Sequence, residues 1–231
     1  MKKGILGLAG LLAMASGSTF AQNVTVDVTG TFSGDRNVLN SSGTAANGLQ
    51  VEVGYFDTAG GFDINNAAQG SIADLQAMGA HWHQFGSTVT TTTSPSSGLA
   101  GSFSYEGIGT SPGSLRIDLW IFNTGGAALA GDYGNVADYG LFTGPVNNSD
   151  TTLNWTFPTG GAFPGNTASL STVDLVNGNH GVAGIAYFGQ IVSSANPNGS
   201  LELLAAVPEP SSAALVVLGL VSSLAFRRVR A

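Results

Sequence analysis

The stretch VTVDVTGTF, residues 24–32, alternates apolar and polar side chains. Successive side chains of an extended strand point to opposite faces, so its three valines and Phe32 share one face and its threonines and Asp27 share the other. This period of two predicts a half-buried β-strand. Two further stretches repeat the pattern, LQVEVGY at residues 49–55 and SLEL at residues 200–203.

More strands are predicted elsewhere in the chain. LRIDLWIF, residues 115–122, begins with the same alternation and then becomes apolar on both faces, which is typical of a strand in the middle of a domain. Other candidate strands are residues 87–93, 99–105, 153–157 and 181–192. Turns rich in glycine, asparagine and proline separate these strands. The pattern predicts an all-β body over residues 22–206, a single antiparallel β-sandwich or jelly-roll-like domain.

One segment departs from the strand pattern. SIAD, residues 71–74, has the form of a helix capping box, with Asp74 in place of the more usual Glu or Gln. Apolar residues follow at spacings of three and four, which predicts that one helix face is buried. These residues are Ile72, Leu75, Met78, Trp82 and Phe85. We therefore expect one short helix near residues 71–83, packed against the sheet.

The most metal-like cluster, His81-Trp82-His83, falls at the end of that predicted helix. Helical residues two apart are about 200° apart around the axis, so the two imidazoles could not bind one ion, whereas on a strand they would share a face. With a helix favoured and no third ligand evident, neither a metal site nor a cofactor is predicted. His180, in the segment NGNHG, is expected in a turn.

Calcium stays open as an alternative at two segments, residues 63–66 and 131–135, which offer hard oxygen ligands. Neither segment has the spacing of an EF-hand loop, and turns rich in Asp and Asn form without any ion.

A hydrolase motif, G-x-S-x-G, is matched by Gly109-Thr110-Ser111-Pro112-Gly113. In a nucleophile elbow the N–H after the serine helps to form the oxyanion hole, and the chain then enters a helix. Pro112 has no N–H, and a strand is expected next, so we interpret the motif as a hairpin turn. A glycoside hydrolase needs two carboxylates in a cleft, which scattered acidic residues do not indicate. The sequence therefore does not predict an enzyme.

The charge distribution excludes some partners. Five of the seven basic residues lie near the two ends of the 231-residue chain, so residues 22–206 hold Arg36, Arg116 and thirteen acidic residues, a formal net charge of −11. Nucleic acids require clustered Lys and Arg and are not expected partners. The chain has no cysteine, so disulfides, thiolate metal sites and cysteine nucleophiles are excluded.

The N-terminal residues have the order of a secretory signal peptide. Lys2 and Lys3 precede an apolar run over residues 4–15, and Thr19-Phe20-Ala21 places small residues at the positions that signal peptidase reads. We expect a signal peptide over residues 1–21, cleavage after Ala21, and export of the body through the Sec translocon.

The C-terminal segment, residues 207–231, combines three features. VPEPS, residues 207–211, leads into an uncharged apolar stretch over residues 211–226, and Arg227, Arg228 and Arg230 follow. As a helix, these 16 residues would cover about 24 Å, a little less than a bilayer core of about 30 Å. Local thinning of the bilayer permits such a span, and the arginines act as a cytoplasmic stop.

This tripartite tail closely resembles the PEP-CTERM sorting signal of exported proteins in Gram-negative bacteria. The resemblance implies that an exosortase, a membrane enzyme resembling cysteine transpeptidases, recognises Pro208, Glu209 and Pro210, flanked by Val207 and Ser211. It also implies processing of the tail and delivery from the inner membrane to the cell surface or to an extracellular polysaccharide matrix. The body is loosely similar to those of other proteins with this tail, which implies no activity.

We therefore expect an exported, transiently membrane-anchored structural or extracellular-matrix protein. The alternative is a surface carbohydrate-binding module, in which Trp82, Trp120 and Trp155 would be the candidates to stack on sugars. A glycoside hydrolase is the third possibility. A solvent-facing row of aromatic residues would favour the sugar-binding module, and buried tryptophans would favour the structural protein.

Overall fold

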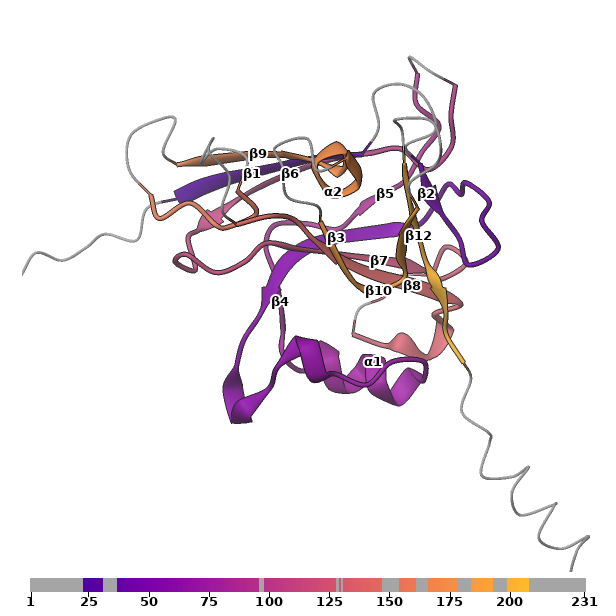
Figure 1. Ribbon diagram of the computed structural model, residues 1–231, viewed down its shortest axis with the longest axis horizontal. Helices are drawn as coiled ribbons and strands as arrows, with labels where there is room; N and C mark the ends of the chain where they lie inside the picture. Colours follow the sequence, from indigo (N-terminus) through magenta and orange to yellow (C-terminus); the bar gives the residue numbers. More distant parts are fainter. Residues whose placement is uncertain are drawn as a thin grey trace, which may run out of the picture.

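A computed structural model describes residues 23–30, 37–95, 98–127, 129, 131–146, 154–160, 166–177, 184–192 and 199–207 (Figure 1). These residues form an all-β fold. The strands are β1 (Asn23–Gly30), β2 (Val38–Leu39), β3 (Gln50–Phe56), β4 (Trp82–Gln84), β5 (Val89–Thr90), β6 (Phe103–Thr110), β7 (Asp118–Asn123), β8 (Asp138–Thr143), β9 (Thr167–Ser171), β10 (Ile185–Phe188), β11 (Gln190–Val192), β12 (Ser200–Glu202) and β13 (Leu204–Ala205). The helices are α1 (Ile72–Gly79) and α2 (Thr172–Asn177), with 3-10 turns η1 (Ala59–Gly61), η2 (Ile64–Asn66) and η3 (Tyr133–Asn135).

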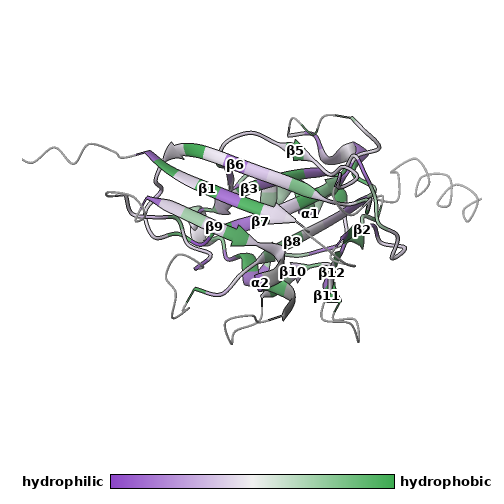
Figure 2. Ribbon diagram, turned by 90° about the horizontal axis from the view of Figure 1, so that it is seen from above, coloured by the Kyte–Doolittle hydropathy of each residue, from purple (hydrophilic) through white to green (hydrophobic). Residues whose placement is uncertain are grey.

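The smaller principal sheet has the strand order β6-β1-β9. Along β1 the three valines are fully buried while the intervening polar residues are half-buried, which confirms the period-two prediction. Hydrophobic and hydrophilic bands alternate along this strand in Figure 2. Burial of each valine side chain stabilises the folded state by about 1.5–3 kcal/mol relative to leaving it exposed.

The larger sheet has the strand order β10-β8-β7-β3-β4. In addition, β13 pairs with β8 and β5 pairs with β3. Its central strands β3, β7 and β8 pair in antiparallel register, for example Val51 opposite Ile121. Three short strands, β11, β12 and β2, form a third sheet. Figure 1 shows the small sheet and α2 on one side of the large sheet and α1 on the other.

Two apolar cores result from this layering. The first fills the space between the two principal sheets and is mainly aliphatic, with Val26, Val53, Leu119 and Ile121 fully buried. The second lies between the opposite face of the large sheet and α1, and is rich in aromatic rings. Its fully or nearly fully buried members are Leu75, Met78, Trp120, Phe122, Leu129, Tyr133, Val136, Tyr139, Leu141 and Phe188.

Helix α1 begins where the capping box predicts. The Ser71 hydroxyl accepts a hydrogen bond from the N–H of Asp74 at 3.1 Å, and the Asp74 carboxylate accepts one from the N–H of Ser71. The helix ends at Gly79 and not at residue 83, because the chain turns there and pairs with β3 as β4. Leu75 and Met78 are buried as the apolar stripe predicts.

The structure differs from the predicted fold in several respects. Two strand pairs, β1 with β9 and β12 with β2, are parallel, so the sheets are mixed and not purely antiparallel. The helix α2 and the strands β8 and β9 were not predicted. Residues 153–157 form no strand in their described part, and Thr156 makes an isolated bridge to Arg116.

The predicted signal peptide lies outside the described residues, as does the tail beyond Val207. Within the residues that the structure describes, no helix is long and apolar enough to span a membrane.

Candidate functional site

The predicted sorting motif begins where the described body ends. Val207 is 58% exposed at the surface. The rest of the motif, Pro208, Glu209, Pro210 and Ser211, lies outside the described residues. The same is true of Arg227, Arg228 and Arg230 of the basic stop and of Ala21 at the predicted cleavage site.

The last described segment is tied to the body by backbone hydrogen bonds. Strand β13 pairs with β8, with Leu204 opposite Tyr139 and Ala205 opposite Asp138. Beyond β13, the N–H of Ala206 donates to the carbonyl of Ala137 at 2.8 Å. The chain therefore leaves the body along the edge of the large sheet.

A second element fixes the exit point. The N–H of Val207 donates to the Gly70 carbonyl at 2.6 Å, and the N–H of Gly70 donates to the Tyr139 hydroxyl at 2.8 Å. Gly70 has a φ of 115°, which a residue with a side chain rarely adopts. Gly70 thus connects the exit to the start of α1 and to the aromatic core.

A depression of about 430 Å³ lies beside β13. Its lining includes Ser41, Gln69, Gln190, Glu202 and Leu204. The amide of Gln190 donates to the Glu202 carboxylate at 2.9 Å. Among the described residues of this lining, Glu202 is the one acidic side chain, so these residues do not supply the carboxylate pair of a glycosidase.

The two histidines lie together on an extended segment, which corrects the helical prediction. His83 is in β4 and His81 directly precedes it. His81 Nδ1 lies 2.9 Å from Asp57 Oδ1, and His83 Nε2 lies 2.6 Å from Asp57 Oδ2. Because an ionised carboxylate only accepts, both contacting nitrogens donate. We call these three residues the histidine clasp.

Further contacts hold the histidine clasp in place. Phe62 stacks on His81 with ring centroids 4.2 Å apart, and Tyr55 stacks on His83 at 5.0 Å. The hydrogen bonds from His83 and His81, with one from the Ala59 N–H, hold the pKa of Asp57 well below its usual range.

The carboxylate of the clasp lies between the imidazoles, with one nitrogen on each oxygen. In the described part of the chain, no three His, Cys, Asp or Glu side chains are arranged to hold a metal ion. The clasp joins the two ends of the segment between β3 and β4, and the Asp57 N–H also donates to the His81 carbonyl at 3.0 Å. Its evident role is to close this segment.

Sequence reasoning missed Asp57 as a partner of the histidines. The signal that was present is the H-x-H spacing, which puts both imidazoles on one face if the segment is extended. Asp57 directly follows β3, two residues beyond the strand predicted over residues 49–55, but only the β3–β4 pairing brings it to the histidines.

Two buried acids lie on the aromatic face of the large sheet. Glu52 accepts hydrogen bonds from Trp82 Nε1 at 2.9 Å and from the Thr88 hydroxyl at 3.2 Å, and burial raises its pKa. Burial also raises the pKa of Asp118 to about 7, although Thr143 and Arg116 act in the opposite direction. Asp118 Oδ1 has no hydrogen-bond partner within the described residues.

These acids do not form an accessible catalytic pair. Glu52 is 7% exposed and Asp118 is 4% exposed. Glu52 is opposite Trp120 in the β3–β7 ladder, and Asp118 is opposite Gly54. The Trp82 ring packs against Gly54, where a Cβ atom would lie 2.8 Å from the ring. The space above these strands is thus filled by a side chain of the protein.

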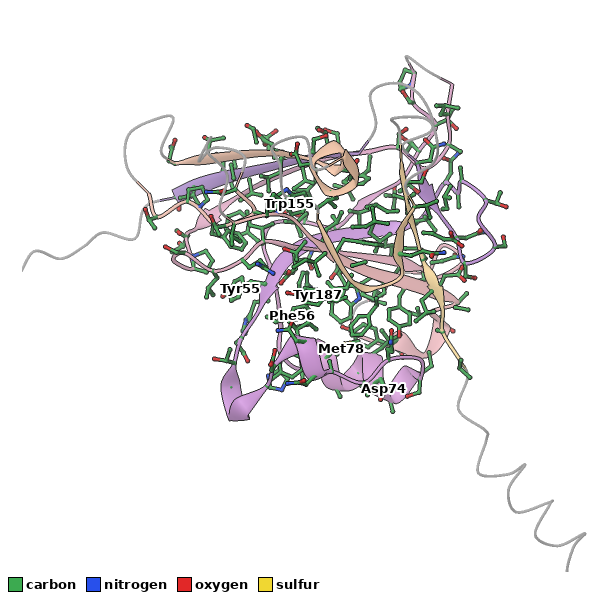
Figure 3. The ribbon with its side chains drawn as sticks, in the orientation of Figure 1. Tyr55, Phe56, Asp74, Met78, Trp155 and Tyr187 are labelled. Atoms are coloured by element: carbon green, nitrogen blue, oxygen red, sulfur yellow. The ribbon has the colours of Figure 1, made fainter. Side chains whose placement is uncertain are left out.

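The three tryptophans differ in exposure. Trp120 and Trp155 are fully buried, and Trp82 is half-buried with its indole N–H bonded to Glu52. Figure 3 shows Trp155 in the interior beside the small sheet, far from α1. These tryptophans do not form a solvent-facing row.

Gly109 and Thr110 of the G-x-S-x-G segment end β6, and Ser111 begins the connection to β7. This connection is not the predicted hairpin turn, because β6 and β7 belong to different sheets. The Ser111 hydroxyl contacts the Pro158 carbonyl and accepts a hydrogen bond from the Gly113 N–H at 3.2 Å. Its contacts are those of a residue that stabilises a turn.

The two calcium-like segments are also stabilised by their own side chains. Asp63 accepts hydrogen bonds from the N–H of Asn65 and the side chain of Asn66 at 2.9 Å. Asp132 accepts one from the N–H of Gly134 at 2.9 Å. Both are Asx turns at the start of a 3-10 turn.

Comparison with known proteins adds no relative from which a role can be transferred. No protein-family model, no curated protein and no solved structure matches this chain.

Proposed function

We propose that this chain is an exported structural or extracellular-matrix protein that is anchored transiently in the inner membrane and sorted to the cell surface through its tail. The observation that carries this proposal is the tripartite segment over residues 207–231. Its apolar part suits a marginal membrane span, and its prolines keep the preceding segment extended and remove backbone donors. The exosortase is the proposed reader of Pro208, Glu209 and Pro210.

The exit of the chain from the body is compatible with this proposal. Val207 lies exposed at a sheet edge, so a segment that follows it starts at the surface. Glu209 is the one charged residue between Glu202 and Arg227. We therefore infer that another protein recognises the Glu209 carboxylate.

The character of the body supports a structural role over sugar binding. Trp120 and Trp155, two of the three candidates for stacking on sugars, are fully buried. The acidic body, with its formal net charge of −11 over residues 22–206, favours solubility outside the cell. After processing, the protein is proposed to lie within the polysaccharide of the extracellular matrix.

The first prediction tests the tail. Glu209→Ala should leave the body folded but leave the full-length protein in the inner membrane, because the reader loses the only charge of its motif. Cell fractionation with an epitope in the body, in a strain that has the exosortase, measures the outcome. Deletion of residues 207–231 should instead release a soluble body into the periplasm.

Glu202→Ala is the matched control, because Glu202 is a surface carboxylate whose observed partner is Gln190. It should be processed like wild type. If Glu209→Ala is also trimmed and reaches the surface, the proposed recognition of the tail is wrong and the segment is only an anchor.

A further inference from the structure

The last four described residues form a strap along the edge of the large sheet. We call residues 204–207 the exit strap. Leu203, which precedes it, is 3% exposed and belongs to the core between the sheets. Leu204 and Ala206 are only partly buried, and Ala205 and Val207 are exposed. The buried anchor of the C-terminal chain is therefore Leu203, and the strap beyond it is held by edge hydrogen bonds and by partial packing of Leu204 and Ala206 against the aromatic core.

The strap limits how far the body can stand from the membrane. The uncharged apolar stretch begins at Ser211, four residues after Val207. Extended chain covers at most about 3.3–3.6 Å per residue, so a closed strap keeps Val207 within about 14 Å of that stretch. A compact body of this length is roughly 40 Å across. A closed strap thus leaves little room for an enzyme between the body and the bilayer.

Release of the strap changes this reach. If residues 204–207 separate from β8, the chain is free from Leu203 onward, and eight residues cover about 28 Å. The segment that becomes accessible is then twice as long, and it is extended and unpaired. Enzymes that bind peptide segments commonly hold them as an added strand, which requires free backbone donors and acceptors.

We propose that the exit strap must detach from β8 and from Gly70 before the tail is processed, so that the stability of the strap sets the rate of sorting. The inference rests on the proposed function of the tail. A processing enzyme acts on the transiently opened form, and its rate follows the population of that form. A two-residue strand at a sheet edge is among the first elements of a fold to open.

A cross-link tests this directly. Ala205 and Asp138 are directly opposite in the antiparallel β13–β8 pair, where Cα atoms lie about 4.5–5.5 Å apart, within the range that a disulfide spans. The chain contains no cysteine, so Ala205→Cys with Asp138→Cys can form one intramolecular disulfide in an oxidising periplasm. We expect the appearance of the processed form to slow at least about tenfold.

Matched variants separate the cross-link from its side effects. The single variants Ala205→Cys and Asp138→Cys should be processed like wild type, although Asp138→Cys loses hydrogen bonds from Ser41 and Asn123. Thr25→Cys with Ile108→Cys places a disulfide on the exposed face of the small sheet, away from the strap, and should have no effect. Circular dichroism establishes that each variant is folded.

Ala206→Pro provides the opposite change. It removes the N–H that donates to Ala137 and lies outside the sorting motif, so the strap should open more often and the processed form should appear faster. Pulse-chase labelling with immunoblotting follows all variants in the strain that has the exosortase.

The outcomes are distinguishable. Slow processing of the cross-linked variant together with fast processing of Ala206→Pro supports the strap as the controlling element. If the cross-linked variant is processed at the wild-type rate, the strap inference is wrong while sorting through the tail stands. If wild type itself is never processed, the proposed function fails.

Discussion

The two faces of the large sheet are built from different residues. Towards the small sheet, β3 and β7 present Val51, Val53, Leu119 and Ile121, all fully buried. Towards α1, the same strands present Gln50, Glu52, Asp118, Trp120 and Phe122. One face is aliphatic, whereas the other combines aromatic rings with buried polar groups.

The difference shows what each face needs from the rest of the chain. The aliphatic face requires only a second sheet with alternating valines, which residues 23–30 supply. The aromatic face also requires hydrogen-bond partners for its polar groups. Gln50, for example, accepts from the N–H of Leu129 at 3.1 Å and donates to the Thr124 hydroxyl at 2.6 Å. The segment between β3 and β4, which includes Asp74 and Met78, covers this face (Figure 3). The histidine clasp closes that segment.

The largest expected effect contrasts the two faces at adjacent positions of β7. Trp120→Ala should lower the free energy of unfolding of the body by about 3–5 kcal/mol, because it leaves a cavity among packed rings. The ring centroid of Trp120 lies 5.2 Å from that of Trp82 and 4.8 Å from that of Phe122. Ile121→Val, on the aliphatic face, should cost about 0.5–1.5 kcal/mol. Urea unfolding of residues 22–206 measures both, and equal losses would contradict the comparison.

The next prediction concerns a buried acid of the aromatic face. Burial raises the pKa of Asp118 to about 7, so between about pH 4 and 7 the folded state holds a proton that the unfolded state has released. Wild-type stability should therefore fall by about 1.4 kcal/mol per pH unit as the pH rises through this window, and this loss should stop above it.

Asp118→Asn should abolish this slope, so that the variant becomes progressively more stable than wild type towards pH 8. Asp132→Asn, at an exposed turn, is the control and should keep the slope. Parallel stability curves for wild type and Asp118→Asn would show that Asp118 does not titrate in this window.

The smallest expected effect lies at the partly exposed clasp. The lowered pKa of Asp57 means that its contribution to stability is present above about pH 4 and is lost as the pH falls further. Asp57→Asn should therefore give a shallower loss of stability on acidification, and replacement of His81 and His83 by alanine should do the same. Thermal unfolding between pH 2 and 7 measures this.

Metal chelation is the control for the clasp. A chelator should leave the melting temperature of wild type unchanged, since one ring nitrogen of each histidine is bonded to the Asp57 carboxylate and no third ligand lies beside them among the described residues. Stoichiometric zinc or copper that is lost in the double histidine variant would show that the clasp is a metal site.

The sequence predicts the aliphatic face better than the aromatic face, for a physical reason. A strand with one buried face shows a period of two, as β1 does. Strand β3 alternates in the same way, but Gln50 and Glu52 are buried on its second face, so it is not the half-buried strand that the alternation predicts. Strand β8 is buried on both faces along all six residues, so DYGLFT carries no alternation. Its place in the sheet depends on β7, which precedes it, and on β10 and β13, which follow.

The stripe from Ile72 to Phe85 misleads for a related reason. Its spacing suits a helix throughout, but Trp82 and Phe85 face separate cores from an extended segment. The pairing of β4 with Tyr55 and Phe56 overrides the local preference. The pattern of the proposed sorting tail is linear and can be recognised in the sequence alone, whereas the histidine clasp depends on that pairing.

The strand order also determines when each strand can pair as the chain is made. Strand β1 is the first part of the body to be made, yet its neighbours are β6 and, still later in the chain, β9. Strand β2 can pair only later still, because the partner of Val38 is Leu201. Folds that depend on such distant pairings form slowly. If the chain crosses the membrane N-terminus first, as the proposed export requires, its third sheet can be completed only after residue 201 has emerged.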